Sequence, residues 1–442
     1  MLFWYTGAVI AMAALWFASS NSDMAYLRQV AQEVTLASRV APGGVISNGG
    51  KNTTGYALRV PGGTQTYYPA FWIRDAAMML GADLVPAGEV DGWIRVVAAT
   101  QPGPEGLKFD HGLQIPAYSI PDHITLGGAA CWFPGAYADQ GVGNYGFLPP
   151  ADDAFYFIQM VYEEFRLTRR QTLLDEKVGT GWGDQPLGEV CAKAFDSVSI
   201  DPETGLVVCD GTPGKTRVDW GFCDSIKKSG SCLMPSLLRW QAARRLADLF
   251  DASGKRDKAD GYRKDAKIIA ASLATTFYHG LTRPGSVEGL LFSTTGLGHK
   301  DDVWASAFAV WLRVLSPKVE GAVARHLMNL YLAGGTAAEG QIRQTPPSGE
   351  YGGGWDKAMT GPEEYQNGGY WATPTGWMVA AIQKVDRAAA GRLIGEFTAH
   401  VKAMRAKGAP FEWINPATNT YRNPSYGSSA GLVYVSLKQA GF

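Results

Sequence analysis

Apolar residues recur at helical spacing along most of the chain, and this period predicts about twelve helices. Five stretches are apolar or small almost all the way round, which is typical of helices buried on every side: 76–85, 154–165, 303–315, 371–382 and 427–437. Their neighbours are amphipathic. The full set of expected helices lies near residues 23–38, 74–85, 89–100, 152–169, 186–198, 232–250, 255–278, 302–315, 318–333, 371–385, 387–407 and 427–440.

Buried helices that alternate with amphipathic ones predict two concentric rings. Six helical hairpins of about 70 residues each would fill residues 23–442, so we expect an all-α, single-domain (α/α)6 toroid. Runs typical of strands are few and short, such as Leu206 to Cys209. Inner helices of such a toroid all run the same way, so the loops before them meet at one rim, beside helix N-termini. Candidate chemistry is therefore expected in those loops.

The charge balance narrows the class of partner. The 442 residues include 40 Lys and Arg and 41 Asp and Glu, a net charge of -1, which argues against nucleic acid or an anionic membrane. With 46% hydrophobic residues the chain can bury a large core. The 14 Trp, 19 Tyr and 54 Gly fit either a sugar-binding surface, where flat rings stack on pyranose C–H faces, or an aromatic core with long loops.

The first 22 residues differ from the rest. Residues 2–18 are apolar and uncharged and precede a short polar run, 19–22. That length is typical of a signal-peptide core. We therefore expect residues 1–22 to be a signal peptide, or else an uncleaved N-terminal anchor, and the protein to be secreted or periplasmic. No second long apolar run follows, so no further membrane contact is expected.

Five cysteines leave the redox state open: Cys131, Cys191, Cys209, Cys223 and Cys232. Export would permit disulfides, and two pairs, 191 with 209 and 223 with 232, are close in sequence. The chain has no C-x-x-C and no Cys/His cluster with zinc spacing. We therefore expect no structural zinc and no cofactor.

The loop before the first buried helix carries Trp72, Arg74 and Asp75. An Arg–Asp pair behind an indole can hold sugar hydroxyls while the ring stacks on the sugar. A helix cap with a surface ion pair is the alternative, and sugar binding is favoured because similar loops recur. The long loop 101–150 then holds Asp110-His111 and Asp122-His123. A metal site there is less favoured than solvated groups or substrate contacts.

Two carboxylates stand among aromatic residues before another buried helix, Asp219 next to Trp220, and Asp224 two residues after Phe222. Apolar surroundings raise the pKa of a carboxyl, as a general acid requires. A loop aspartate plus a helix-capping aspartate is the alternative. The pairs 152–153 and 301–302 also precede buried helices, and there capping is the favoured explanation.

Three later loops combine acids, amides and aromatics at Gly-rich turns, a density that packing hardly explains. No phosphate-binding loop, dinucleotide fingerprint or G-x-S-x-G motif appears in a supporting context. The loops run over Tyr351–Asp356, with Trp355; Glu363–Trp371, with Glu364, Tyr365, Gln366 and Asn367; and Phe411–Asn419, with Glu412.

In this order, over residues 56–437, the motifs resemble those of six-hairpin glycosidases: α-glucosidase-I-like enzymes, trehalases, glucoamylases and neutral invertases. Trp72–Asp75 resembles the W-x-R-D motif that binds the sugar. Val218–Phe222 is similar to the V-D-x-G-F segment with the general acid, and Tyr365–Trp371 to Y-H-N-G-G-x-W. Glu412–Asn419 resembles E-x-Y-x-P-x-T-G, whose Glu is the general base, but Trp413-Ile414 and Asn419 depart from it.

The resemblance implies an exo-acting, inverting glycoside hydrolase that cleaves a di- or oligosaccharide, with Asp219 as acid and Glu412 as base. Asp224 is a rival acid, because a Cys-bounded insertion after it allows the alignment to slip, and Glu364 is a rival base. The carbohydrate contacts that the resemblance implies are Trp72, Arg74, Asp75, Trp220, Trp355, Tyr365, Gln366, Asn367 and Trp371.

Two other functions stay open. A polysaccharide lyase or uronyl-acting enzyme on the same toroid needs a Tyr or His base and basic residues, and only His111, His123 and His299 lie in candidate loops. This alternative ranks second to the glycoside hydrolase, for that reason and because a near-neutral chain fits an uncharged sugar better than a uronate. A carbohydrate-binding toroid without catalysis predicts aromatic and amide contacts but no separated pair of carboxyl groups.

Overall fold

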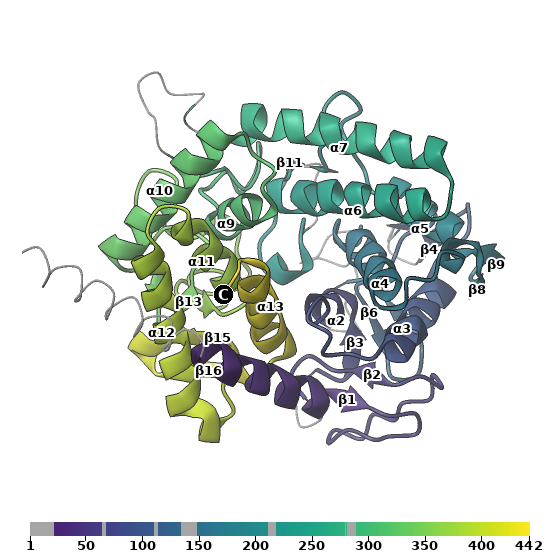
Figure 1. Ribbon diagram of the computed structural model, residues 1–442, viewed down its shortest axis with the longest axis horizontal. Coiled ribbons are helices and arrows are strands. Elements are labelled where there is room, and N and C mark those ends of the chain that lie inside the picture. The colour runs from purple at the N-terminus through teal and green to yellow at the C-terminus, as the bar shows by residue number, and fades with distance from the viewer. Residues whose placement is uncertain are drawn as a thin grey trace, which may run out of the picture.

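The computed structural model describes residues 22–63, 68–109, 114–133, 148–210, 218–278, 280 and 289–442. Within these residues helices dominate, and they alternate between an inner and an outer ring (Figure 1). The inner helices are α2 (Ile73–Met78), α4 (Asp153–Thr168), α6 (Leu233–Ala252), α9 (Val303–Leu312), α11 (Thr375–Gln383) and α13 (Gly427–Gln439). The outer helices are one over 22–37, α3 (Ala87–Thr100), α5 (Leu187–Asp196), α7 (Arg256–Phe277), α10 (Pro317–Ala333) and α12 (Arg387–Met404).

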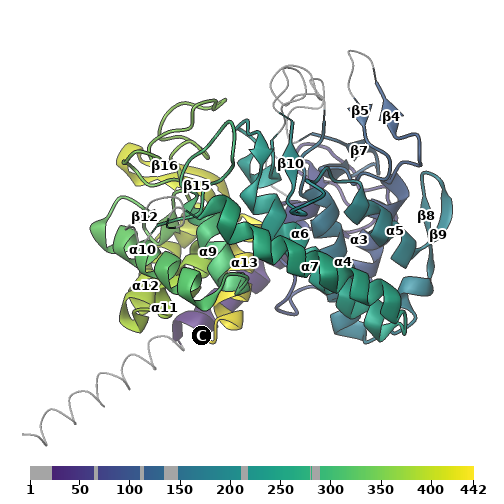
Figure 2. The same cartoon turned by 90° about the horizontal axis from the view of Figure 1, so that it is seen from above.

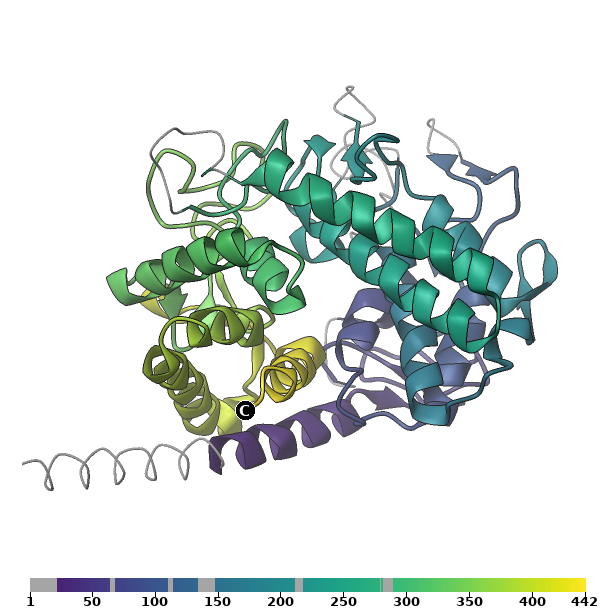
Figure 3. The same ribbon diagram turned by 45° about the horizontal axis from the view of Figure 1, so that its top comes forward.

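The inner ring is closed. Each inner helix contacts the next one along the chain, and α13 contacts α2. The helix over 22–37 lies beside the last outer helix (Figures 1 and 3), where Lys402 pairs with Asp23 at 3.1 Å and Arg405 with Glu33 at 2.7 Å. The two rings confirm the toroid that the alternation predicts.

Burial explains which helices are inside. Every residue of α9 from Val303 to Val310 is buried, as is every residue of α11 from Thr375 to Ile382. Helix α7 instead buries one stripe, since its buried residues are Ala259, Ala266, Ile269, Leu273 and Phe277. One hydrophobic cluster joins the two rings and extends from Leu27 to Leu437.

Two local expectations differ from the structure. Helix α2 ends at Met78 rather than near residue 85, because Gly81 and Asp83 adopt positive φ angles of 100° and 60°, which stop a helix.

Asp302 caps α9 as expected, accepting from the Ala305 N–H at 2.8 Å. Neither carboxylate of the 152–153 pair caps α4, so the favoured capping explanation is wrong there.

Many of the short strands gather on one side of the helical rings (Figure 2). The sequence indicated few strands, because most have only two residues, too few to show an alternating pattern. A five-stranded sheet has the order β12 (Ala337–Ala338), β13 (Gln341–Ile342), β14 (Tyr370–Trp371), β15 (Phe411–Asn415) and β16 (Thr420–Pro424). A three-stranded sheet has the order β3 (Ala70–Trp72), β6 (His123–Thr125) and β7 (Ala130–Cys131).

The remaining strands pair in twos, and single 3-10 turns connect several elements. The pairs are β1 (Arg39–Val40) with β2 (Leu58–Arg59), β4 (Leu107–Lys108) with β5 (Gln114–Ile115), β8 (Lys177–Thr180) with β9 (Gly183–Pro186), and β10 (Val208–Cys209) with β11 (Gly230–Ser231). The 3-10 turns are η4 (Leu173–Asp175), η5 (Gly221–Cys223), η6 (Arg405–Lys407) and η7 (Pro416–Thr418).

All five cysteines belong to the described part of the chain, where each is buried and none forms a disulfide. Among the described helices, none combines the length and the apolar character that a membrane crossing requires. Residues 1–21, most of the expected signal segment, lie outside the described residues, as do Asp110 and His111.

Candidate active site

The loops before four of the inner helices meet at one cavity of about 240 Å³. These loops precede α2, α6, α11 and α13, which agrees with the expectation that chemistry gathers where the chain enters inner helices. The lining residues are Tyr68, Trp72, Arg74, Asp75, Gly221, Phe222, Asp224, Tyr365, Trp371, Glu412 and Tyr426.

The first of these loops supplies the predicted Trp-x-Arg-Asp residues. Trp72 ends β3, where it pairs with His123 of β6, and the two rings stack with centroids 4.3 Å apart. Asp75 lies in the first turn of α2 and accepts a 3.3 Å hydrogen bond from Ser428. Burial raises the pKa of Asp75 to about 6, against the opposing charge of Arg74. Asp75 is therefore a buried cavity group rather than a helix cap.

Arg74 is held in place by acids behind the cavity. Its guanidinium forms an ion pair with Asp122 and lies 3.9 Å from Asp153 Oδ1, and all three side chains are buried. The same guanidinium lies 5.6 Å from the Phe222 ring centroid. A Cβ on Gly221 would overlap the Arg74 guanidinium, so any other residue at that position would displace the guanidinium. The arginine has one fixed orientation toward the cavity.

Asp224 is the carboxylate that the loop before α6 brings to the cavity. It follows the 3-10 turn η5 and receives a 2.9 Å hydrogen bond on Oδ1 from Gln366 Nε2. Burial raises the pKa of Asp224 to about 6, while the charge of Arg74 and the hydrogen bond from Gln366 oppose the rise. A carboxyl group with a raised pKa stays protonated to higher pH, which allows it to act as an acid.

Glu412 lies on β15, far along the chain from Asp224. Tyr68 Oη donates to Glu412 Oε1 at 2.7 Å, Tyr365 Oη lies 3.4 Å from the same oxygen, and Asn423 Nδ2 donates to Oε2. Burial raises the pKa of Glu412 to about 7, although the hydrogen bonds from Tyr68 and Asn423 favour the ionised form. The carboxylate is thus oriented by three neutral donors, as a base that must ionise requires.

Aromatic rings make up much of the remaining wall. The Tyr365 and Trp371 ring centroids are 5.0 Å apart, and Tyr68 meets Trp72 edge-on at 5.0 Å. The turn that presents Tyr365 is very tight, because a Cβ on Gly369 would lie 2.5 Å from the Tyr365 carbonyl oxygen. Flat apolar faces beside carboxylates suit a ligand with both C–H and hydroxyl groups, such as a sugar.

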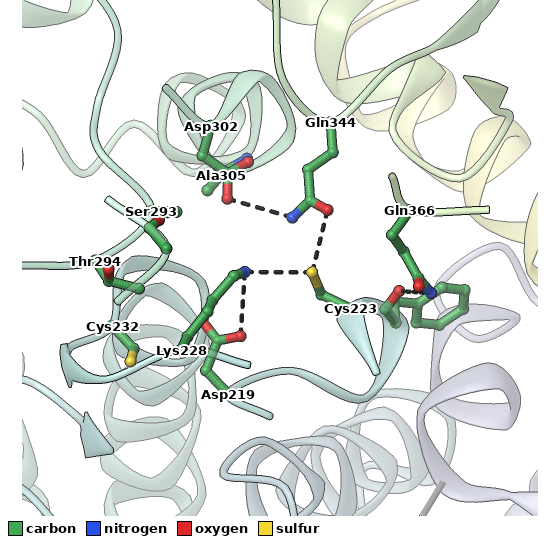
Figure 4. Close-up of polar contacts among 12 residues, drawn as sticks. Asp219, Cys223, Lys228, Cys232, Ser293, Thr294, Asp302, Ala305, Gln344 and Gln366 are labelled. Atoms are coloured by element: carbon green, nitrogen blue, oxygen red, sulfur yellow. Dashed lines mark hydrogen bonds and ion pairs between the residues drawn. The ribbon is translucent and has the colours of Figure 1, made fainter. Parts of the chain in front are cut away.

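Asp219, the acid that the family resemblance implies, does not line this cavity. Its carboxylate is fully buried and forms a 3.2 Å ion pair with the ammonium group of Lys228 (Figure 4). The chain turns at η5 between the two acids, so the side chains of Asp219 and Asp224 contact different residues. The rival acid, Asp224, is therefore the one that reaches the cavity.

Five other expected site residues also lie away from the cavity lining. The Trp220 indole donates to Tyr156 Oη at 3.0 Å, and the Trp355 indole donates to the Gln366 carbonyl at 3.1 Å. The Asn367 amide group bonds the backbone of residues 355, 360 and 361. Glu364, the rival base, is exposed. Gln366 also lies behind the wall, but it contacts Asp224 directly.

Sequence reasoning missed several residues of the site. Tyr68 and Asn423 both bond Glu412, and Tyr426 lines the cavity directly before α13. The rule that chemistry precedes inner helices points to Tyr426. Nothing in the sequence pattern indicates Asn423, which adopts a positive φ of 51° in β16.

Of the two Asp-His pairs in the 101–150 loop, Asp122-His123 belongs to the described residues. The Asp122 carboxylate pairs with Arg74 and also contacts His123, whose Nδ1 lies 2.7 Å from Asp122 Oδ2. Across the described residues, no group of three or more His, Cys, Asp or Glu side chains has an arrangement suited to a metal ion.

A larger cavity, of about 550 Å³, involves the C-terminal parts of inner helices. Among its cations, Arg313 and Lys384 cap the C-termini of α9 and α11, where positive charge balances the helix dipole. Its carboxyl groups among the described residues are Glu163 and Asp248, and Asp248 is exposed, so this cavity has no counterpart of the Asp224 and Glu412 pair. We therefore regard the smaller cavity as the candidate active site.

Comparison with known proteins agrees with the fold. No protein-family model matches the chain, and no curated protein matches its sequence. Among solved structures, it is similar to the GH63 mannosylglycerate hydrolase of Thermus thermophilus in complex with glucose, with a TM-score of 0.56, 14% identity, and coverage of 92% of this chain and 99% of that one.

Two glucoamylases are similar at the same low identity. That of Saccharomycopsis fibuligera has a TM-score of 0.53 and 14% identity, and the match covers 94% of this chain and 95% of that one. That of Hormoconis resinae has a TM-score of 0.53 and 14% identity, with 95% and 73% covered. The chain therefore has the (α/α)6 fold of the six-hairpin glycosidases.

Proposed function

We propose that this protein is an exo-acting, inverting glycoside hydrolase in which Asp224 is the general acid and Glu412 the general base. The observation that carries the proposal is the presence on one cavity of two carboxyl groups with raised pKa values, the buried Glu412 and the partly exposed Asp224, from loops far apart in the chain. The cavity of about 240 Å³ has room for a single sugar ring, which supports cleavage at a chain end.

In this mechanism Asp224 donates its proton to the glycosidic oxygen as the bond to the anomeric carbon breaks. Glu412 removes a proton from a water molecule that attacks the same carbon from the opposite face. An inverting pair needs room for that water, which places the carboxyl groups about 6.5–9.5 Å apart. Positive charge develops on the sugar ring during the reaction, and the carboxylates of Asp75 and Glu412 stabilise it.

Substrate binding would depend on the other cavity residues. Arg74 and Asp75 present fixed donors and acceptors for sugar hydroxyls, and Trp72 and Tyr365 offer ring surface. The glucose in the Thermus thermophilus structure is bound to that protein, and it supports a carbohydrate as the ligand here. Residues 23–442 would form the catalytic domain.

A uronyl substrate fits the cavity less well. Among the described residues that line the cavity, Arg74 is the one cation, and Asp122 already pairs with it. Burial raises the pKa of Tyr68, Tyr365 and Tyr426 well above the usual value, so none of these phenols is suited to act as a base. The alternative of a lyase therefore loses support.

The experiment is a product screen on di- and oligosaccharides, followed by NMR of the first-formed anomer. We expect a monosaccharide product with inverted configuration. Asp224→Asn and Glu412→Gln should each lower kcat by about 10²–10⁴-fold. Retention of configuration, an unsaturated product, or an Asp224→Asn variant with wild-type kcat on a substrate that needs acid assistance would each contradict the proposal.

Where the protein acts is a separate proposal. The apolar segment 2–18 would direct export, with residues 1–22 removed as a signal peptide or retained as an anchor. N-terminal sequencing of the protein after secretion from a host cell distinguishes the two, and a protein retained with the cytosolic fraction would contradict both.

A further inference from the structure

Lys228 is a fully buried lysine next to the candidate active site, and the proposed reaction does not use it. Lysine is almost never buried completely unless its charge is paired. Here the Nζ atom lies 3.2 Å from Asp219 Oδ1 and 3.3 Å from Cys223 Sγ, and 4.8 Å from the Trp355 ring centroid. The ammonium group is thus surrounded by protein on several sides.

The contacts continue beyond these neighbours (Figure 4). The Cys223 thiol donates to Gln344 Oε1 at 3.1 Å, and Gln344 Nε2 lies 3.5 Å from Asp302 Oδ2. Burial on its own would lower the pKa of Lys228, but the charges of Asp219 and Asp302, together with the contact to Cys223, raise it above its usual value. The lysine therefore stays charged, and it interacts electrostatically with two aspartates, Asp219 and Asp302.

These partners come from separate loops of one rim. Asp219 and Cys223 precede α6, Asp302 caps α9, Gln344 follows β13, and Trp355 precedes β14. A single side chain thus joins the loop that bears Asp224 to the neighbouring loops. Apolar packing would hold such loops together without fixing one orientation, whereas a paired ammonium group constrains geometry.

The chain between the two charged residues contains the proposed acid. Asp219 and Lys228 are the ends of a ten-residue segment that their ion pair closes, and Asp224 lies near its middle. The segment is tied elsewhere as well, since the Cys223 N–H bonds the Trp220 carbonyl at 2.7 Å and the Gly221 N–H bonds Asp152 Oδ2 at 3.0 Å. The ion pair is the contact that joins the two ends of the segment to each other.

We propose that Lys228, through its ion pair with Asp219, is a positioning residue that holds Asp224 for proton donation. This inference rests on the proposed function. Neither Lys228 nor Asp219 lines the cavity, so neither touches the sugar, and both act through the loop that they close. Their loss should lower kcat for substrates that need a proton on the leaving group and leave KM nearly unchanged.

The test is the double variant Asp219→Asn/Lys228→Met, which removes both charges of the ion pair. The single variant Lys228→Met leaves Asp219 charged and buried, which strongly destabilises the fold, whereas the double variant should keep a melting temperature near that of the wild type. We expect its kcat to fall at least tenfold on the natural glycoside. The glycosyl fluoride of the same sugar needs no acid, and there kcat should stay within about twofold.

A matched control is the pair Lys300 and Asp356, which lies on the same rim with a 3.2 Å separation but is partly exposed. The variant Lys300→Met/Asp356→Asn should keep kcat on both substrates. A double variant at 219 and 228 with wild-type kcat, or with equal losses on glycoside and fluoride, would overturn the positioning role.

Hydrogen exchange separates this inference from the proposed function. If the wild type hydrolyses no sugar, the proposed function fails, but backbone amides of residues 219–228 can still be compared by mass spectrometry. Exchange should be faster in the Asp219→Asn/Lys228→Met variant and unchanged in the Lys300→Met/Asp356→Asn variant. Equal protection of the segment in all three proteins would overturn the claim that the ion pair orders this loop.

Discussion

Tyr68 Oη donates a 2.7 Å hydrogen bond to Glu412 Oε1 across 344 positions of the chain. The bond joins the loop before the first inner helix to the strand that precedes the last one. It forms because the ring of inner helices closes between α13 and α2. A neutral donor at a carboxylate favours the ionised form and lowers its pKa, which is what a general base requires.

Removing this donor should shift the pH dependence of the reaction. The base acts when ionised, so activity is lost as the pH falls through the pKa of Glu412. In Tyr68→Phe that pKa rises, so a smaller fraction of Glu412 is ionised, and kcat/KM below about pH 7 should fall by about tenfold for a rise of about 1 unit. Tyr365→Phe removes a donor at 3.4 Å and should lower kcat/KM less. An unchanged or higher kcat/KM in this pH range would disprove the role of Tyr68.

Gly221→Ala tests the fixed position of Arg74. The added Cβ would overlap the guanidinium, so Arg74 must move and sugar binding should suffer. We expect kcat/KM to fall by about tenfold or more, in line with the loss of about 1.4 kcal/mol of binding to the transition state. Gly261→Ala, in outer helix α7 with nothing within 4 Å, is the control, and it should stabilise the fold without changing kcat/KM. Unchanged kinetics in Gly221→Ala would show that Arg74 is not part of the site.

Two helix caps should have different consequences. Asp386 caps outer helix α12 through the N–H groups of Ala388 and Ala389, at 2.8 and 3.0 Å, and Asp386→Ala should lower the free energy of unfolding by about 1 kcal/mol with kcat unchanged. Asp302→Ala leaves the buried Ala305 N–H without its acceptor and should cost about 2 kcal/mol. Because Asp302 also contributes charge near Lys228, its loss should lower kcat. Chemical denaturation and steady-state kinetics measure both effects, and equal behaviour of the two variants would refute the distinction.

Buried carboxyl groups predict that stability falls as the pH rises. Burial raises the pKa of Asp152 from 3.8 to about 7 and that of Glu412 from 4.5 to about 7. Between about pH 4 and about pH 7 the native state holds protons that the unfolded chain has lost. The free energy of unfolding should therefore decrease through this window, by about 1.4 kcal/mol per pH unit for each such group.

Thermal unfolding between about pH 4.5 and about pH 7.5 checks this sign. The melting temperature should decline toward neutral pH, and Asp152→Asn should make the decline shallower because the amide does not titrate. Asp257→Asn is a matched control, since Asp257 is an exposed residue in the first turn of α7, and this substitution should leave the slope unchanged. A melting temperature that rises over this range would contradict the assignment of raised pKa values to the buried acids.

The amino-acid sequence by itself determined the helical architecture. The period that places α9 and α11 inside the toroid and α7 outside is a local property, because one apolar face or a wholly apolar surface can be recognised within a single helix. The same alternation predicted that cavity residues precede inner helices, as Trp72 and Glu412 do. The types of residues and their order along the chain were therefore sufficient to predict the two rings of helices and the loops that carry the cavity residues.

Only the tertiary structure decided which acid faces the cavity. Asp219 and Asp224 are five positions apart in one loop, and no local pattern distinguishes them. Their orientation depends on partners from elsewhere, Lys228 behind Asp219 and Gln366 beside Asp224. A buried charge must lie where its partner lies, and the position of that partner follows from how the rings pack rather than from the neighbouring residues.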